Sequence, residues 1–150
     1  MLRLVHVVFG AVWVGMMAFT VIFLTPAVRD VGPEGGKVMT ALQRRGVMLV
    51  TPLIALGTLV SGMWLYQRFY GGFAGMMATR VGFMFGIGGA AAVLAVLLGI
   101  TVMRSAMTLA AASSDQTEIQ RLRARGAAVG KAVALLLLLA AAAMAVARYV

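Results

Sequence analysis

The chain has a single histidine, His6, and three methionines that are expected to lie at a similar depth in the molecule. These methionines are Met63, Met84 and Met144. His6 with two or three thioethers would suit Cu(I), and His6 with one thioether would suit a haem iron. The alternative is a histidine near a membrane surface that hydrogen-bonds a backbone carbonyl or water. Most of the twelve methionines in so apolar a chain serve packing, so both interpretations stay open.

Other groups that support catalysis are scarce. The acidic residues all fall in predicted loops and are Asp30, Glu34, Asp115 and Glu118. Without a carboxylate in any apolar stretch, neither a Ser/His/Asp arrangement nor a carboxylate pair can form there. The chain has no cysteine, which excludes thiolate metal sites and iron–sulfur clusters held by this chain alone. We therefore expect no enzymatic activity, and the absence of intramembrane acids disfavours proton-coupled transport.

The elements that position these residues are predicted to be transmembrane helices. Hydrophobic residues make up 63% of the chain, charged residues make up 11%, and the mean hydropathy is +1.01. A soluble domain of this size has no need for so much apolar surface. The net charge of +9 does not indicate nucleic-acid binding, because the basic residues lie at the ends of apolar runs, where they anchor helices. We expect one domain over residues 1–150, an all-α four-helix transmembrane bundle.

Four apolar stretches predict the spans, at about residues 4–24, 46–66, 80–103 and 127–147. The first forms about 31 Å of helix, enough to cross the hydrocarbon core of a bilayer. We expect it to remain uncleaved and to end before Pro26, which cannot donate to the helical ladder. Early in the second span, either a helix begins at Thr51 or a longer helix kinks at Pro52, and we favour the longer helix.

The fourth span is expected to begin outside the membrane. Asp115 with Glu118 three positions later is a capping pattern, which predicts a helix starting near Gln116. This helix would continue through an arginine-rich segment into the span, giving a length of about 50 Å. Its first turns must therefore project from the bilayer.

Small residues at helical spacing predict close contacts between helices. They are Gly10 on the face of His6, Gly57 and Ser61 in the second span, Gly82 and Gly86 in the third, and Gly126 and Gly130 in the fourth. Trp13 also shares the face of His6, and it lies near mid-span, away from the interfaces where tryptophan normally gathers. We expect Trp13 to fill a helix interface, or a contact with another subunit or a pigment, rather than to perform chemistry.

The basic residues are divided unequally between the two sides of the predicted membrane. The longer loops carry Arg29, Lys37, Arg44, Arg45, Arg104, Arg121, Arg123 and Arg125, whereas the short loop and the termini carry Arg3, Arg68, Arg80 and Arg148. The positive-inside rule predicts cytoplasmic long loops and outer termini, in a bacterial inner membrane. The arginines expected to meet lipid phosphates or an acidic partner are Arg44, Arg45, Arg121, Arg123 and Arg125.

The first span resembles a known family. The pattern formed by His6, Gly10, Trp13 and Gly15, with Pro26 after the span, is similar to the first helix of the copper-resistance protein D-like (CopD-like) membrane proteins and their four-helix relatives. Looser similarities are Arg44 and Arg45 before the second span, Gly62 near its end, and a closing helix that ends with Met144, Arg148 and Tyr149. The resemblance implies a helical bundle and copper handling, with His6 as the candidate ligand.

Two functions follow as expectations. The first is a non-catalytic accessory subunit of a larger membrane complex of electron-transfer or photosynthetic type, because the chain is small, rich in glycine and alanine, and poor in catalytic groups. The second is a CopD-like copper- or haem-binding membrane protein. The expected partners are a bilayer with anionic headgroups and other membrane subunits, without nucleic acid.

Overall fold

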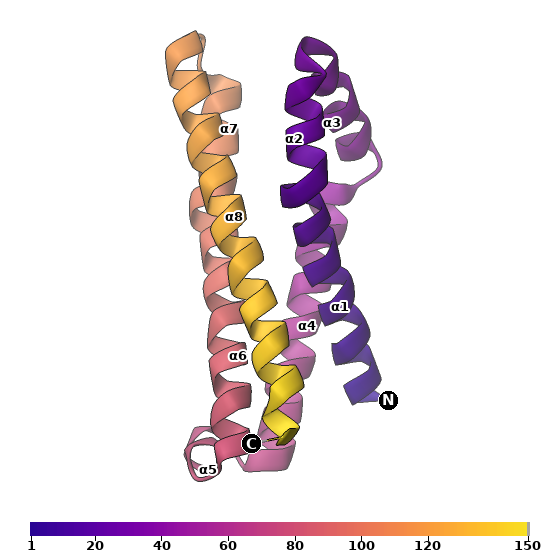
Figure 1. Cartoon of the computed structure of the whole chain (residues 1–150), viewed down its shortest axis with the longest axis vertical. Coiled ribbons are helices and arrows are strands. Elements are labelled where there is room, and N and C mark those ends of the chain that lie inside the picture. Colours follow the sequence, from indigo (N-terminus) through magenta and orange to yellow (C-terminus); the bar gives the residue numbers. More distant parts are fainter. Residues whose placement is uncertain (150) are drawn as a thin grey trace.

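Four long helices dominate the computed structural model, which describes residues 1–149 and, within them, all side chains but those of Pro33, Arg104, Met107 and Ala111. Each is long and apolar enough to cross a membrane, and they cover Leu2–Asp30, Val47–Tyr70, Arg80–Ala110 and Gln116–Tyr149. No strand occurs among residues 1–149. The predicted all-α four-helix transmembrane bundle is therefore confirmed (Figure 1).

The first long helix continues through the proline that was expected to end it. It comprises α1 (Leu2–Phe19), a π-helical turn (Thr20–Leu24) and α2 (Thr25–Asp30). In the π turn, the amide of Thr25 donates to the carbonyl of Thr20, five positions earlier. Pro26 then lies in the first turn of α2, where the missing amide of a proline is tolerated. The prediction of a helix end before Pro26 is therefore wrong.

A short helix and a sharp turn separate the first two long helices. After a 3-10 turn (Gly32–Glu34), α3 (Gly35–Arg44) packs against α2, and α4 (Val47–Tyr70) follows. Gly46, between α3 and α4, has a φ of 81°, a left-handed conformation that glycine adopts without steric cost. Pro52 lies inside α4, so the predicted longer helix through this proline is confirmed.

The third long helix follows a glycine turn at Gly71 and Gly72. It is preceded by α5 (Phe73–Met77) and comprises α6 (Arg80–Leu98), a second π turn (Gly99–Met103) and α7 (Arg104–Ala112). The helix thus continues beyond the predicted span end at residue 103. The hydroxyl of Thr101 donates to the carbonyl of Leu97 at 2.6 Å, and that of Ser105 donates to the carbonyl of Thr101. These polar residues therefore satisfy their hydrogen-bonding groups within the helix.

The last long helix begins where the capping pattern predicts. It comprises α8 (Gln116–Val146) and a 3-10 turn (Ala147–Tyr149). The carboxylate of Asp115 accepts the amide of Thr117 at 2.8 Å, whereas Glu118 accepts the hydroxyl of Ser113 at 2.6 Å. Asp115 therefore caps the helix as predicted, and Glu118 closes the loop before it. With 31 residues, α8 is about 46 Å long and exceeds the hydrocarbon core of a bilayer.

Replacing Asp115 by alanine is expected to lower the free energy of unfolding by about 1 kcal/mol, because α8 loses its N-terminal cap. Thermal unfolding in detergent, together with amide hydrogen exchange in the first turn of α8, measures this loss. Ser114→Ala is the matched control, since Ser114 is exposed and makes no side-chain hydrogen bond among the described residues. Equal unfolding temperatures for the two variants would contradict the capping role.

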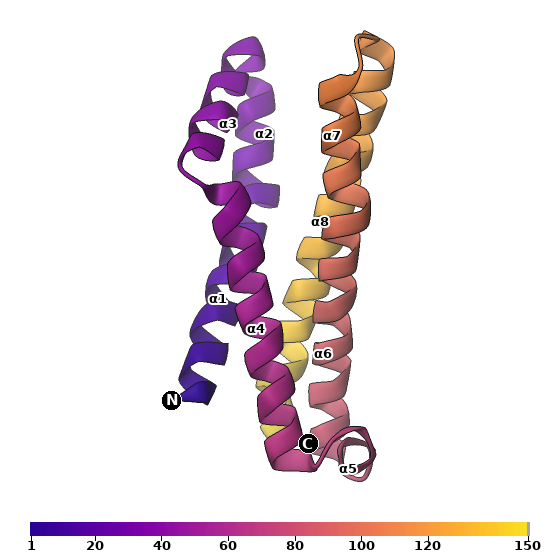
Figure 2. The ribbon, with the colours of Figure 1, turned by 180° about the vertical axis from the view of Figure 1, so that it is seen from behind.

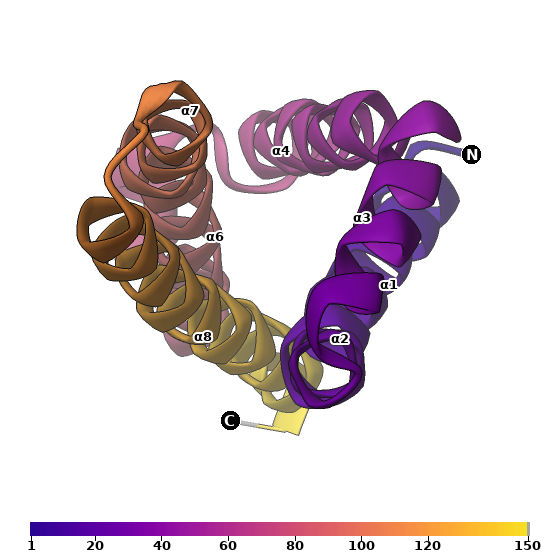
Figure 3. The same cartoon turned by 90° about the horizontal axis from the view of Figure 1, so that it is seen from above.

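The long helices form two hairpins whose connections lie at the same end of the molecule. α1 packs against α4, α6 packs against α8, and further contacts join α1 to α8 and α4 to α6. Both termini and α5 lie at one end, here called the terminal end, and the connections of both hairpins lie at the other, the loop end (Figures 1 and 2). Seen from above, α2 and α3 lie apart from α7 (Figure 3). The hairpins are therefore joined through the spans, and their loop ends are separate.

The second hairpin repeats the burial pattern of the first at a separation of 79 positions. This separation relates the π turns that start at Thr20 and Gly99. It also relates the buried residues of α4 to those of α8, as Ala55 to Ala134, Thr58 to Leu137 and Ser61 to Ala140, and it relates Trp13 to Ala92. The two hairpins thus share these buried positions and the place of the π turn. The second has apolar residues at the two positions where the first has buried hydroxyls.

Trp13 lies in the centre of the molecule. It is 4% exposed and belongs to a buried cluster to which all four long helices contribute, with Met17, Ala55, Ala92, Ala95, Val133, Leu137 and Ala140. The small residues of this cluster leave the volume that the indole fills, as close packing of protein interiors requires. The middle of the bundle is therefore a packed core around one large side chain.

Candidate functional site

His6 connects the first two long helices near the terminal end. Its Nδ1 lies 2.9 Å from the backbone carbonyl oxygen of Thr58 and 3.3 Å from the hydroxyl oxygen of Ser61. Because a carbonyl only accepts hydrogen bonds, Nδ1 carries the proton, and in the neutral ring Nε2 keeps the free electron pair. The hydrogen bond to a backbone carbonyl, expected for a histidine without a ligand, is therefore present, and it leaves Nε2 open to either role.

The ring of His6 packs on a glycine of α4. A Cβ atom placed on Gly62 would lie 2.7 Å from Cε1 of His6, closer than real Cβ contacts allow. One and a half turns earlier, the ring of Phe9 occupies the space above Gly57. These two glycines admit aromatic rings of α1, and the hydroxyls of Thr58 and Ser61 between them are buried.

The hydroxyls around His6 also bond the helix that carries them. Ser61 donates to the carbonyl of Gly57 at 2.6 Å, and Thr58 donates to that of Ile54 at 2.9 Å. Such bonds satisfy hydroxyl groups inside a membrane without a second helix. The Thr58 carbonyl is therefore the main hydrogen-bond partner of the imidazole. Because it is a backbone group, the types of the side chains in α4 do not predict it.

The three methionines considered with His6 lie in different surroundings. Met63 is 71% exposed on the outside of α4, and Met84 of α6 is half-buried. Met144 of α8 packs on Gly88 of α6. None of them hydrogen-bonds His6 within residues 1–149, and the described residues contain no group of three His, Cys, Asp or Glu side chains that would hold a metal ion. The Cu(I) site formed by His6 with these methionines therefore stays a prediction.

The small residues singled out from the sequence lie at several contacts between helices. Gly10 faces Thr58, and Ser61 faces His6. Gly82 and Gly86 lie against Met76 of α5, and Gly86 also lies against Tyr66 of α4. Gly126 faces Ala106 of α7, while Gly130 faces Val21 and Met103, one from each π turn. Gly57 and Trp13 occupy the positions described above.

The main contact between α6 and α8 uses another set of residues, which the sequence reasoning missed. Besides Gly82, the buried residues of α6 are Gly88, Ala92 and Ala95. In a helix with glycine or alanine at so many successive positions, several faces satisfy the small-residue pattern equally well. Only the position of α8 decides which face is buried.

The five arginines expected at the membrane surface all lie toward the loop end and are exposed. Arg44 and Arg45 lie at the end of α3, and Arg121, Arg123 and Arg125 lie in the first part of α8. The four acidic residues also belong to this end, and one ion pair is found among the described side chains, between Lys37 and Glu34 at 2.5 Å. These arginines and the acidic side chains are thus concentrated at the loop end, outside the spans.

Comparisons with protein-family models, with curated proteins and with solved structures give no match for this chain. The chemistry of the site is therefore inferred from its own residues.

Proposed function

We propose that this chain is a non-catalytic accessory subunit of a larger membrane assembly, of electron-transfer or photosynthetic type. The observation that carries the proposal is the packed core around Trp13, which is 4% exposed in a cluster drawn from all four long helices. Such a core fills the space that a transported substrate would need. The acidic residues lie outside the spans, which leaves His6 as the one ionisable group of the kind that serves proton transfer.

The outer surface of α4 supports a role in assembly. It carries an open apolar groove lined by Leu56, Leu59, Val60, Met63, Trp64 and Gln67. Trp64 and Met63 are 62% and 71% exposed. Aromatic residues and methionine are enriched where proteins bind one another. This face therefore supports contact with a neighbouring membrane subunit.

The orientation belongs to the same proposal. Seven of the basic residues named above, Arg29, Lys37, Arg44, Arg45, Arg121, Arg123 and Arg125, belong to the loop end, against Arg3, Arg68, Arg80 and Arg148 at the terminal end. The positive-inside rule then supports a cytoplasmic loop end in a bacterial inner membrane, with the termini outside. Labelling of cysteines introduced at each end, in intact cells, tests this orientation.

Purification from native membranes in a gentle detergent tests the accessory role. We expect the chain to elute in a large assembly together with other membrane subunits in fixed ratio. A homogeneous monomer that carries no partner under conditions that preserve other membrane complexes would overturn the proposal.

A second candidate is a CopD-like protein in which His6 binds copper or haem. It is favoured by the bond from Nδ1 to the carbonyl of Thr58, because metal-ligating histidines usually donate their other ring nitrogen to such a group. His6 would supply one imidazole, and further ligands would come from methionine thioethers or from another subunit. The group would supply redox or metal-transfer chemistry, and Thr58 and Ser61 would hold the ring in place.

The His6→Ala and His6→Asn variants separate this candidate from a structural role. If His6 is a ligand, both variants lose the bound copper or the Soret band, because neither retains Nε2. If His6 is structural, the wild-type protein carries neither group. Alanine then lowers the free energy of unfolding by about 1 kcal/mol, while asparagine, whose amide can replace Nδ1–H, retains most of the stability. Metal analysis, optical spectra and thermal unfolding of the three proteins measure these outcomes.

A further inference from the structure

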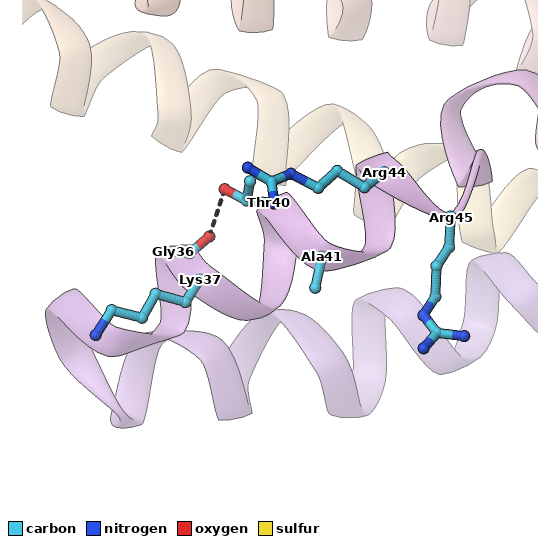
Figure 4. Close-up of a pocket in the computed structure, with 6 residues that line it drawn as sticks. All are labelled: Gly36, Lys37, Thr40, Ala41, Arg44 and Arg45. Carbon is cyan, nitrogen blue, oxygen red and sulfur yellow. Dashed lines mark hydrogen bonds between the residues drawn. The ribbon is translucent and has the colours of Figure 1, made fainter.

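The exposed face of α3 forms an open groove at the loop end. It is lined by Gly36, Lys37, Thr40, Ala41, Arg44 and Arg45 (Figure 4). Within it, the hydroxyl of Thr40 donates to the carbonyl of Gly36 at 2.9 Å, so the nitrogen atoms of the basic side chains are the free donors. A groove of this composition attracts anions.

The two arginines of the groove are available for binding. Lys37 is paired with Glu34, whereas no carboxylate lies within ion-pair distance of Arg44 or Arg45 among the described side chains. Both arginines are exposed. The guanidinium groups of the two arginines point to different sides of α3 (Figure 4), so each presents its own planar fork of donors, which matches phosphate oxygens better than other anions.

The depth of these arginines matches the headgroup region of a bilayer. Arg45 lies next to Gly46, the residue that precedes α4, and α4 spans about 36 Å, which is close to the hydrocarbon thickness plus part of the headgroups. The separation of 79 positions between matching features of the hairpins supports the same depth. Arg123 lies 79 positions after Arg44 and, like it, precedes the apolar part of a spanning helix.

The positions of the acidic residues help to decide whether the negative charge comes from an acidic protein in solution or from a lipid in the membrane. Asp30 and Glu34 lie at the far tip of the turn between α2 and α3, while Arg44 lies at the end of α3 that returns to α4. An acidic protein approaching from solution would meet these carboxylates first. A lipid within the bilayer reaches the arginines from the membrane side.

We propose that the groove of α3 binds the phosphate of an anionic lipid headgroup through Arg44 and Arg45. The bound lipid holds α3 at the membrane surface and thereby fixes the turn at Gly46. This inference requires only that the chain spans a bilayer, so it does not depend on the accessory role proposed above.

The test begins with the wild-type protein in detergent, titrated with phosphatidylglycerol or phosphatidylcholine and followed by native mass spectrometry. We expect clear preference for phosphatidylglycerol that persists in the presence of millimolar inorganic phosphate. Equal retention of the two lipids would overturn the proposal. Displacement by inorganic phosphate, or binding of an acidic peptide in place of the lipid, would also overturn it, because the source of the negative charge would then be soluble.

Variants locate the site. Each basic group near a membrane surface contributes about fivefold to binding, so the double variant Arg44→Ala/Arg45→Ala is expected to weaken phosphatidylglycerol binding about 25-fold. The control Arg68→Ala/Arg148→Ala removes the same charge at the terminal end and is expected to leave binding within about twofold. Equal losses in the two variants would assign the effect to net charge and overturn the site. Should the alanine variant fold poorly, Arg44→Lys/Arg45→Lys keeps the charge, and its expected severalfold loss tests the guanidinium geometry instead.

Discussion

Trp13→Ala is expected to lower the free energy of unfolding by about 3–5 kcal/mol, the range found when a large aromatic side chain is removed from a core. Trp13 is 4% exposed in a cluster with Ala92, Ala95 and Leu137. These neighbours are short or already packed, so they cannot move in to fill the cavity. Unfolding in increasing concentrations of a denaturing detergent, followed by circular dichroism, measures the loss.

The other tryptophan provides the control. Trp64 is 62% exposed on α4, so Trp64→Ala leaves no internal cavity and is expected to change the unfolding free energy by less than about 1 kcal/mol. A similar loss in both variants would mean that Trp13 stabilises the protein through general hydrophobicity. The proposed packed core, and with it the main support for the accessory role, would then be wrong.

The second large effect is expected from Gly88→Val in α6. A Cβ atom on Gly88 would lie 2.9 Å from Cγ of Met144 and 3.0 Å from the carbonyl oxygen of Ala140. The methionine can move, but the carbonyl belongs to the backbone of α8, so the two helices must separate. We expect a loss of about 1–3 kcal/mol, as found for overpacked cores, measured by the same unfolding assay.

The neighbouring glycine is a matched control. A Cβ atom on Gly89 meets nothing within 4 Å, so Gly89→Val adds the same side chain to the same helix without a clash. Helix propensity changes equally in both variants, and their difference therefore reports the contact between α6 and α8. If Gly89→Val were the more destabilising variant, the register of α6 on α8 described here would be incorrect.

Apolar length and capping chemistry allowed the spans and the start of α8 to be predicted. The hydrocarbon thickness fixes how many apolar residues a span needs, and Asp115 is a local signal that acts within one turn. The helix end near Pro26 was predicted wrongly. A π turn precedes Pro26, which then lies in the first turn of α2, where its missing amide is tolerated.

The candidate site was predictable only in part. His6 is the one histidine of the chain, and the sequence predicts a backbone carbonyl as one kind of hydrogen-bond partner for it. The identity of that partner as Thr58 was not, because every residue of α4 offers the same carbonyl and the choice depends on the crossing of α1 and α4. The same holds for Gly88, which is one of many glycines until the position of α8 is known.

The two π turns have a consequence for the way this protein can change. An extra residue in one turn delays the helical phase by about 100°, so the residues beyond it no longer share a stripe with those before it. In each hairpin this phase break lies between the buried core and the loop end. Residues at the loop end therefore do not lie on the helical stripes that pack in the core, and a change of their charge does not reach those stripes. The surface at that end can therefore change by substitution while the spanning part keeps its packing.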